Sequence, residues 1–279
     1  MELNGQPENT ILTLNELSIA FSHEGKENLA VDQISFSLRR GSTLGIVGES
    51  GSGKSVTSLA IMGLVPKPAG KITGGSIIFH NANGENTDLL LLPEREMRLW
   101  RGKRIAMIFQ EPMTSLNPSV RCGRQVMENI LEHEKVTRSQ ARQRTIDLFR
   151  EVMLPDPEGI FNAYPHQVSG GQKQRVMIAM ALACNPDILI ADEPTTALDV
   201  TVQKTILELL RNLQKKHNIT LIFISHNLDV IAEIATNVLV MYKGKIVEKG
   251  SILQIFNNPQ HPYTKGLLAC RPPLNQRPA

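Results

Sequence analysis

The chain has 279 residues, of which 41% are hydrophobic and 20% are charged, a balance typical of a globular α/β domain with subdomains. A net charge of +3 and an aromatic content of 4% give no reason to expect nucleic acid as a partner. Three widely separated cysteines predict reduced thiols rather than a disulfide framework. The first ten residues do not resemble a signal peptide, and no apolar run of about 18 residues predicts a membrane span.

The N-terminal part of the chain predicts strands and one helix. Apolar and polar residues alternate with a period of two over 11–21 and 31–39, as they do in half-buried strands. The apolar run 43–47 leads through a Gly/Ser loop into the helix-like segment 54–64, which is the opening of a parallel α/β unit. Further strands are expected at 72–80 and 104–109.

The segment 120–153 differs in composition from the rest of the chain. It is polar and rich in Arg, Gln and Glu, and its apolar residues recur at spacings of three and four, which predicts helices. We expect these helices to belong to a separate subdomain over about 111–170.

The second half of the chain predicts helices that alternate with buried strands. Helices are expected at 170–183 and 200–216, and each precedes an almost continuously apolar run that is typical of a strand buried on both faces. This alternation predicts a parallel sheet with right-handed crossovers. Shorter strands and helices are expected at 237–242, 245–248, 251–257 and 262–269. The expected fold is therefore one α/β domain, 1–279, with a C-terminal extension over about 251–279.

Residues 48–55 read GESGSGKS and match the phosphate-loop pattern G-x-x-x-x-G-K-[ST] at every position. Glycines allow such a loop to curl around a phosphate with its N–H groups pointing inward, and the following helix adds its dipole. Lys54 is expected to bridge the β- and γ-phosphates and Ser55 to ligate Mg²⁺. A flexible turn is the competing interpretation, but the position between a strand and a helix favours phosphate binding. The candidate residues of this loop are Gly48, Ser50, Gly51, Ser52, Gly53, Lys54, Ser55 and Val56.

An apolar strand at 188–193, ILIADE, ends in two carboxylates, Asp192 and Glu193. Ligands of parallel α/β sheets bind at this carboxyl edge. We expect Asp192 to hold Mg²⁺, usually through water, and Glu193 to orient or deprotonate the attacking water. Acids after strands also cap helices, so the pair alone leaves that interpretation open. Together with the phosphate loop, it favours nucleotide hydrolysis.

A third motif, VSGGQKQR at 168–175, resembles the signature motif of the ABC ATPase family, with Val168 where leucine is most frequent. Its SGG stands at a predicted helix start, where backbone amides form a second anion-binding end. Because this end has no lysine, it suits the γ-phosphate of a nucleotide held by a partner subunit. A plain helix start is the competing interpretation. The resemblance implies nucleotide contacts from Ser169, Gly170, Gly171 and Gln172.

Four further positions resemble landmarks of the same family. Gln110, after the strand RIAMIF, resembles the glutamine that contacts Mg²⁺ and the attacking water and senses the membrane partner. Ala197-Leu198-Asp199 resembles the D-loop, which lies across the dimer interface and makes Asp199 a candidate contact. His226, after TLIFIS, resembles the switch histidine that contacts the γ-phosphate. Phe21 stands where the family has an aromatic residue on adenine, with a core strand aromatic as the competing interpretation.

The resemblance implies a P-loop NTPase fold with a parallel core sheet, an antiparallel β subdomain and a helical subdomain. It also implies a head-to-tail dimer, with a second copy or a second ABC ATPase, that hydrolyses ATP with Mg²⁺. Two stretches, FQEPMTSLNP (109–118) and NNPQHPYTKGLL (257–268), are similar to the oligopeptide, dipeptide and nickel importer ATPases. The implied partners are two polytopic permease subunits and, indirectly, a solute-binding protein. The implied location is the cytoplasmic face of the inner membrane, as a peripheral subunit.

Some alternatives stay open from the sequence alone. Relatives often carry a cysteine-rich tail after the HPYT segment, whereas only Cys270 stands there in this chain, and an iron–sulfur cluster takes about four thiolates. The chain is expected to be either a short form or one half of a tandem two-ATPase protein. A soluble ABC ATPase without a transport partner is the alternative function, and the cargo is open among peptides, nickel and glutathione.

Overall fold

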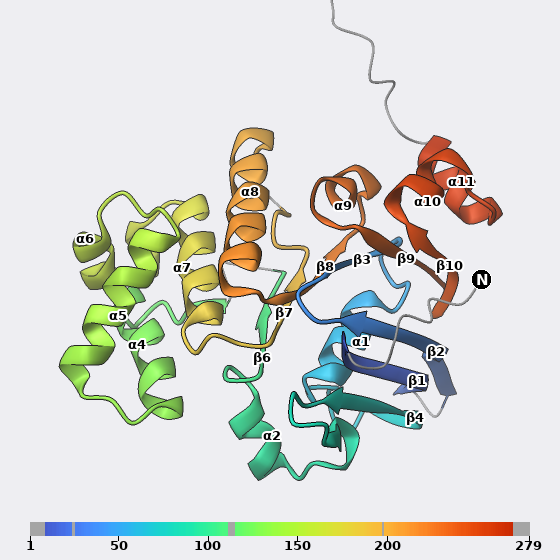
Figure 1. Cartoon of the computed structure of the whole chain (residues 1–279), viewed down its shortest axis with the longest axis horizontal. Coiled ribbons are helices and arrows are strands. Elements are labelled where there is room, and N and C mark those ends of the chain that lie inside the picture. The colour runs from blue at the N-terminus through green and yellow to red at the C-terminus, as the bar shows by residue number, and fades with distance from the viewer. Residues whose placement is uncertain (1–8, 24–25, 111–114, 197, 270–279) are drawn as a thin grey trace, which may run out of the picture.

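A six-stranded sheet crosses the centre of the computed structural model, which describes residues 9–23, 26–110, 115–196 and 198–269 (Figure 1). Its strand order is β10-β9-β3-β8-β7-β6. The bounds are β3 Thr43–Val47, β6 Ile105–Ile108, β7 Ile188–Asp192, β8 Thr220–Ser225, β9 Asn237–Tyr242 and β10 Lys245–Ser251. Strands β9, β3, β8, β7 and β6 pair in parallel, as predicted. Strand β10 pairs antiparallel with β9. Lys243 and Gly244 connect β9 to β10, and both have positive φ, which is the geometry of a tight hairpin turn.

The sheet is buried on both faces at β3, β7 and β8, which explains the continuous apolar runs of these strands. Along β8, Leu221 and Phe223 pack into a cluster on one face, and Ile222 and Ile224 pack into a second cluster on the other. Among the helices that contribute to the first cluster are α7 (Gly170–Leu182), α8 (Val200–His217) and α9 (Leu228–Ile234). The second cluster joins the sheet to α1 (Lys54–Ile61) and to a smaller sheet.

The smaller sheet is antiparallel, in the order β2-β1-β4-β5. Its bounds are β1 Thr10–His23, β2 Lys26–Arg39, β4 Gly70–His80 and β5 Asn86–Asp88. The alternation that predicts β1 and β2 slips by one residue at Glu16 and Gln33, which have positive φ where the pairing register is irregular. Because of the slip, Leu14 and Leu17 lie in the same buried cluster although they are three residues apart.

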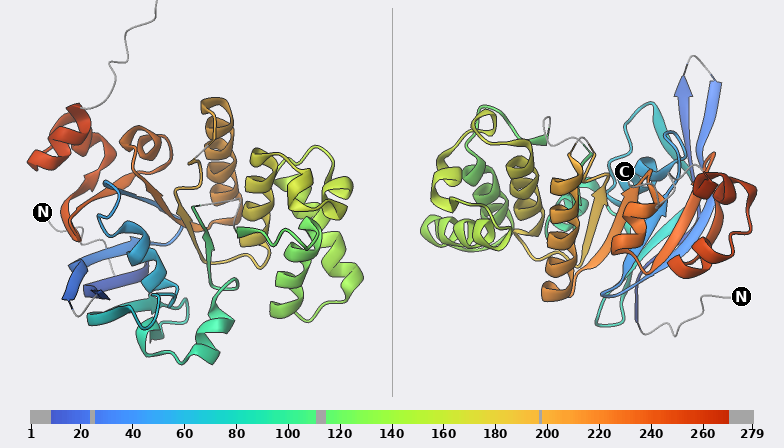
Figure 2. Two further views of the ribbon diagram at one scale, coloured as in Figure 1. Left: turned by 180° about the vertical axis from the view of Figure 1, so that it is seen from behind. Right: turned by 90° about the horizontal axis from the view of Figure 1, so that it is seen from above.

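A group of helices lies at the end of the molecule away from the antiparallel sheet (Figures 1 and 2). Its members are α4 (Cys122–His133), α5 (Arg138–Glu151), α6 (Pro157–Asn162) and the 3₁₀ helix η3 (Pro165–Gln167). α5 begins at a capping box formed by Thr137 and Gln140. Val126 and Phe149 pack into the same apolar cluster as α7. The subdomain boundaries near 111 and 170 stay a prediction, since 111–114 lie outside the described residues.

Several short elements were not predicted from the sequence. They are β5, α6 and α9, together with η2 (Leu89–Leu91) and α2 (Glu94–Trp100). Each has seven residues or fewer, which is too short for an apolar period to stand out. On the C-terminal side, α10 (Ile252–Asn257) and α11 (Pro262–Ala269) agree with the two predicted short helices.

Gly45 lies in β3 and packs closely against α9 and the residue that follows it. A Cβ at this position would lie 2.3 Å from Cγ2 of Ile231 and 3.2 Å from Cβ of Ala235. Gly45→Ala is therefore expected to lower the free energy of unfolding by about 1–3 kcal/mol, because it overpacks a dense layer. Urea denaturation measures this change. The matched control is Gly74→Ala in β4, where a Cβ meets nothing within 4 Å; equal stabilities of the two variants would contradict the close packing.

Candidate nucleotide-binding site

The phosphate loop joins β3 to α1 and is shaped by its glycines. Gly51 and Gly53 have φ values of 79° and 100°, which side chains with a Cβ adopt only with strain. A Cβ at Gly48 would lie 2.3 Å from the carbonyl oxygen of Met241. Because α1 begins at Lys54, its first amides have no carbonyl partner within the helix and can bind an anion. The loop therefore has a geometry suited to phosphate.

The Lys54 side chain lies inside this loop and donates hydrogen bonds to it. Its Nζ donates to the carbonyl oxygens of Gly48 and Glu49 at 2.7 and 2.8 Å and to Ser52 Oγ at 3.4 Å. Burial lowers the pKa of this ammonium, while the acids at the end of β7 and Glu49 act in the opposite direction. A polyphosphate in the loop would meet a desolvated positive charge, where electrostatic attraction is strong.

Asp192 stands at the carboxyl end of β7 and is almost fully buried. It is 4% exposed, and within the part of the chain that the structure describes its Oδ1 has no hydrogen-bond partner. Burial raises the pKa of this carboxyl group, and the Ser55 hydroxyl beside it lowers that pKa. An unpartnered carboxylate oxygen next to a serine hydroxyl fits Mg²⁺, which takes oxygen ligands and keeps several waters.

The Glu193 carboxylate contacts three side chains that come from different elements. Its Oε2 accepts hydrogen bonds from Thr196 Oγ1 at 2.9 Å and Gln110 Nε2 at 3.2 Å, and lies 3.1 Å from His226 Nδ1. Gln110 follows β6 and His226 follows β8, the two strands that flank β7. The sheet therefore brings the three residues that we expect to be catalytic, Gln110, Glu193 and His226, into one cluster.

The backbone at Glu193 is also unusual. Its φ of 46° lies in the left-handed region, which non-glycine residues rarely adopt, and its N–H donates to the carbonyl of Ile224 at 3.0 Å. Thr196 was not predicted as part of this cluster. A threonine three residues after an acid carries no signal on its own, and only the turn between them, in which the Thr196 amide donates to the Glu193 carbonyl at 3.1 Å, brings the two side chains together.

The signature residues stand at the start of α7, as the sequence predicts. The Ser169 hydroxyl accepts from the Gln172 amide at 3.3 Å, and the Gln172 side chain accepts from the Ser169 amide at 2.9 Å. This is a capping box, so within one chain these residues serve as a helix start. Ser169 and Gly170 are nevertheless exposed, and a Cβ at Gly170 would meet nothing within 4 Å. This end of α7 is thus open to a second molecule.

Asp199 and Phe21 complete the set of predicted residues. Asp199 caps α8, accepting from the Val202 amide at 2.9 Å, and is exposed beside Val200. Ala197 of the same motif lies outside the described residues. Phe21 is half-buried in β1 and packs against the cluster between the two sheets, as a core aromatic does. Its contact with adenine stays a prediction.

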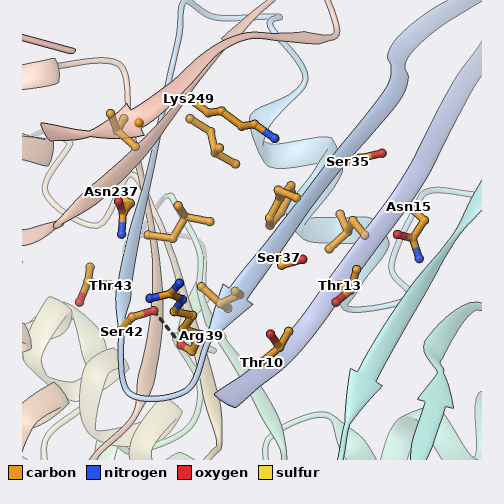
Figure 3. A pocket seen from close by; sticks show the side chains of 17 residues that line it. Thr10, Thr13, Asn15, Ser35, Ser37, Arg39, Ser42, Thr43, Asn237 and Lys249 are labelled. Atoms are coloured by element: carbon orange, nitrogen blue, oxygen red, sulfur yellow. Dashed lines mark hydrogen bonds between the residues drawn. The ribbon is translucent and has the colours of Figure 1, made fainter. Parts of the chain in front are cut away.

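A cavity of about 340 Å³ lies on another side of the molecule, between the two sheets (Figure 3). It is lined by the first residues of β3 and β9, Thr43 and Asn237, and by polar side chains of β1 and β2. At one end the Ser42 hydroxyl donates to the Arg39 carbonyl at 2.7 Å. Because the phosphate loop follows the opposite end of β3, this cavity is not part of the nucleotide site.

Comparison with known sequences identifies the family of the chain. A family model for ABC transporters matches residues 31–196, and one for the C-terminal region of oligopeptide/dipeptide transporters matches 247–279. The oligopeptide transport ATP-binding protein OppD of Bacillus subtilis is 53% identical over 95% of this chain and 72% of its own length. The dipeptide transport ATP-binding protein DppD of Escherichia coli is 51% identical, over 95% and 80%. The glutathione import ATP-binding protein GsiA of Pectobacterium atrosepticum is 51% identical, over 96% of this chain and 43% of that protein.

Solved structures agree with the fold. A dimeric ATP-binding cassette in a post-hydrolysis state, bound to ADP and Pi, matches with a TM-score of 0.76 and 26% identity over 87% of this chain and 99% of that one. The cbiO1 protein of Clostridium perfringens matches with a TM-score of 0.72 and 26% identity, over 90% and 92%. The fold and the phosphate loop together are those of an ATP-binding cassette. The chain belongs to the ABC transporter family and is an ATP-binding subunit that hydrolyses ATP. Among its described residues, no helix is long and apolar enough to cross a membrane.

Proposed function

We propose that this chain is the ATP-hydrolysing subunit of an importer that takes up peptides or a related small solute, such as glutathione or nickel. The names of its relatives and the match at 247–279 support this assignment. The chain spans less than half of the glutathione relative, so cargo and partners belong to the proposal. A soluble ABC ATPase without a transport partner is the alternative, and the transport names of these relatives do not favour it.

The enzymatic part of the proposal rests on one observation, the contact of Glu193 with Gln110 and His226 beside the loop that holds Lys54. The loop amides and Lys54 bind the β- and γ-phosphates of ATP. Glu193 takes a proton from the water that attacks the γ-phosphorus, and the bond from that phosphorus to the oxygen of ADP breaks. His226 and Gln110 orient the carboxylate and the water.

Three residues fit Mg²⁺ in this proposal. When bound, the ion supplies positive charge that neutralises the phosphate oxygens. Asp192 offers an unpartnered buried oxygen, and the Ser55 hydroxyl lies beside it. Gln110 is the third candidate, because its amide lies at the carboxyl edge of the sheet against Glu193.

A second subunit completes each site in the proposal. The start of α7, Ser169 to Gln172, of which Ser169 and Gly170 are exposed, faces the γ-phosphate of a nucleotide held by the partner, and Asp199 lies across the interface. The partner is a second copy of this chain or a second ABC ATPase, arranged head to tail. Two polytopic permease subunits bind this pair at the cytoplasmic face of the inner membrane, and a solute-binding protein delivers the cargo to them.

The isolated chain is expected to hydrolyse ATP weakly, with a specific activity that rises with protein concentration. The reason is mass action, because only the dimer contains a complete site. Phosphate release per mole of protein is measured over a dilution series, beside sedimentation of the same samples and after adding the permease subunits. Constant activity per molecule in a demonstrated monomer would contradict the shared site. No hydrolysis in any sample, with or without permeases, would contradict the proposed function.

A further inference from the structure

The C-terminal helix α11 contacts the phosphate loop. The Tyr263 hydroxyl accepts a hydrogen bond from the backbone N–H of Glu49 at 2.9 Å, between residues 214 positions apart in the sequence. Glu49 is the second residue of the loop that follows β3. The proposed mechanism does not use this contact, because it involves no residue of α11.

The contact holds one side of a peptide unit whose other side is held by Lys54. The unit joins Gly48 to Glu49, and its carbonyl oxygen accepts from Lys54 Nζ at 2.7 Å. In a trans peptide the C=O and N–H groups point in opposite directions. Lys54 therefore contacts this peptide from inside the loop and Tyr263 from outside, and together they fix the orientation of its plane.

Tyr263 itself is held in place by several contacts. Its ring packs on the ring of Tyr242, with centroids 4.2 Å apart. The Glu248 carboxylate accepts from the amides of Gln260 and His261 at 2.7 and 3.0 Å, which fixes the segment leading into α11. The Tyr263 amide donates to His261 Nδ1 at 3.2 Å. The hydroxyl is thus presented to the loop by an ordered segment.

The turn between β9 and β10 contacts the phosphate loop at a second point. Gly244, in the turn between β9 and β10, donates its N–H to the carbonyl oxygen of Ser52 at 3.1 Å. A Cβ at Gly244 would lie 2.9 Å from the carbonyl oxygen of Ala30, so this turn is confined between the loop and β2. The outer side of the phosphate loop is therefore supported at Glu49 and at Ser52.

We propose that Tyr263 is a positioning residue for the nucleotide, acting through the Gly48–Glu49 peptide of the phosphate loop. Bound phosphates compete with the loop carbonyls for the ammonium of Lys54. The Tyr263 hydroxyl lies outside the loop, so the phosphates do not compete for it, and it keeps the peptide in place while they bind. This inference rests on the proposed function, because it concerns the same loop.

The test is Tyr263→Phe, which removes the hydroxyl and keeps the ring. Loss of one hydrogen bond of this kind is expected to weaken binding of Mg·ADP about threefold to tenfold. The KM for ATP should rise by a similar factor, while kcat at saturating ATP changes by less than about twofold, because the reacting groups are untouched. Titration calorimetry with Mg·ADP, which is not hydrolysed, and steady-state phosphate release measure these values.

Tyr242→Phe is the matched control, because it removes a hydroxyl from the stacked ring. In the part of the chain that the structure describes, the Tyr242 hydroxyl makes no hydrogen bond, so this variant should bind Mg·ADP as the wild type does. Tyr263→Ala also removes the ring and should lower the Tm clearly, whereas Tyr263→Phe loses one hydrogen bond and should lower the Tm by at most a few degrees.

Wild-type affinity in Tyr263→Phe would overturn the inference. So would a loss of affinity that Tyr242→Phe shares, or one that comes with the fall in Tm seen in Tyr263→Ala, because packing would then explain it. If Tyr263→Phe binds as the wild type does while the wild type binds and hydrolyses normally, only the inference fails. A wild type that does not bind Mg·ADP contradicts the proposed function and this inference with it.

Discussion

Glu193→Gln is expected to keep binding of Mg·ATP and to lower turnover by about 10²–10⁴-fold, the usual contribution of a general base. The substitution keeps the shape of a side chain that is only 12% exposed. Its amide oxygen can still accept from the Thr196 hydroxyl, which lies 2.9 Å from Oε2 in the wild type. What it loses is the basic oxygen that takes the proton from water. Because bound ATP is then not consumed, the variant should accumulate as a nucleotide-bound dimer.

Phosphate release, ATP titration and size-exclusion chromatography with ATP measure the three expectations for this variant. Glu233→Gln is a suitable control, because Glu233 is an exposed residue of α9 and takes no part in the site. Wild-type turnover in Glu193→Gln would remove Glu193 from the mechanism. Loss of ATP binding together with turnover would instead assign it a role in holding the nucleotide.

The sequence was sufficient to predict that three polar side chains lie close together at the carboxyl edge of the core sheet. Gln110, Glu193 and His226 each follow a short apolar run, and parallel strands end at the same edge, so their proximity follows once the strands are known. The strands themselves were predictable because β7 and β8 are buried on both faces and read as continuous apolar runs.

Other features depend on contacts that no local pattern carries. Glu16 and Gln33 have positive φ without being glycines, so the slips in β1 and β2 have no marker in the sequence. The bond between Tyr263 and Glu49 joins residues 214 positions apart, and it arises only because β10 and α10 return the chain to the loop. Ser169 shows a further limit, because a helix cap and a phosphate contact require the same residue type at the same position.

A mixture of Lys54→Ala chains and Ser169→Arg chains, each inactive alone, is expected to recover up to about half of the wild-type activity per heterodimer. In a head-to-tail dimer with twofold symmetry, one site of the heterodimer contains both lesions and the other contains neither. The fold supports this arrangement, because α1, which begins at Lys54, and α7, which Ser169 caps, pack in the clusters on opposite faces of the core sheet. Figure 2 shows α7 beside the group of α4 to α6.

Two differently tagged chains, co-expressed and purified through both tags, provide heterodimers of known composition for the phosphate-release assay. Ser169 also caps α7, and loss of such a cap costs about 1 kcal/mol, so thermal unfolding must first show that Ser169→Arg is folded. Ser169→Ala is the control for stability, because it loses the cap without adding a bulky cation and so shows how much of any fall in Tm comes from the cap alone. If Ser169 acted on the nucleotide held by Lys54 of its own chain, every site in the mixture would carry one lesion. Proven heterodimers would then show no recovery, and this result would contradict a site shared between the two chains.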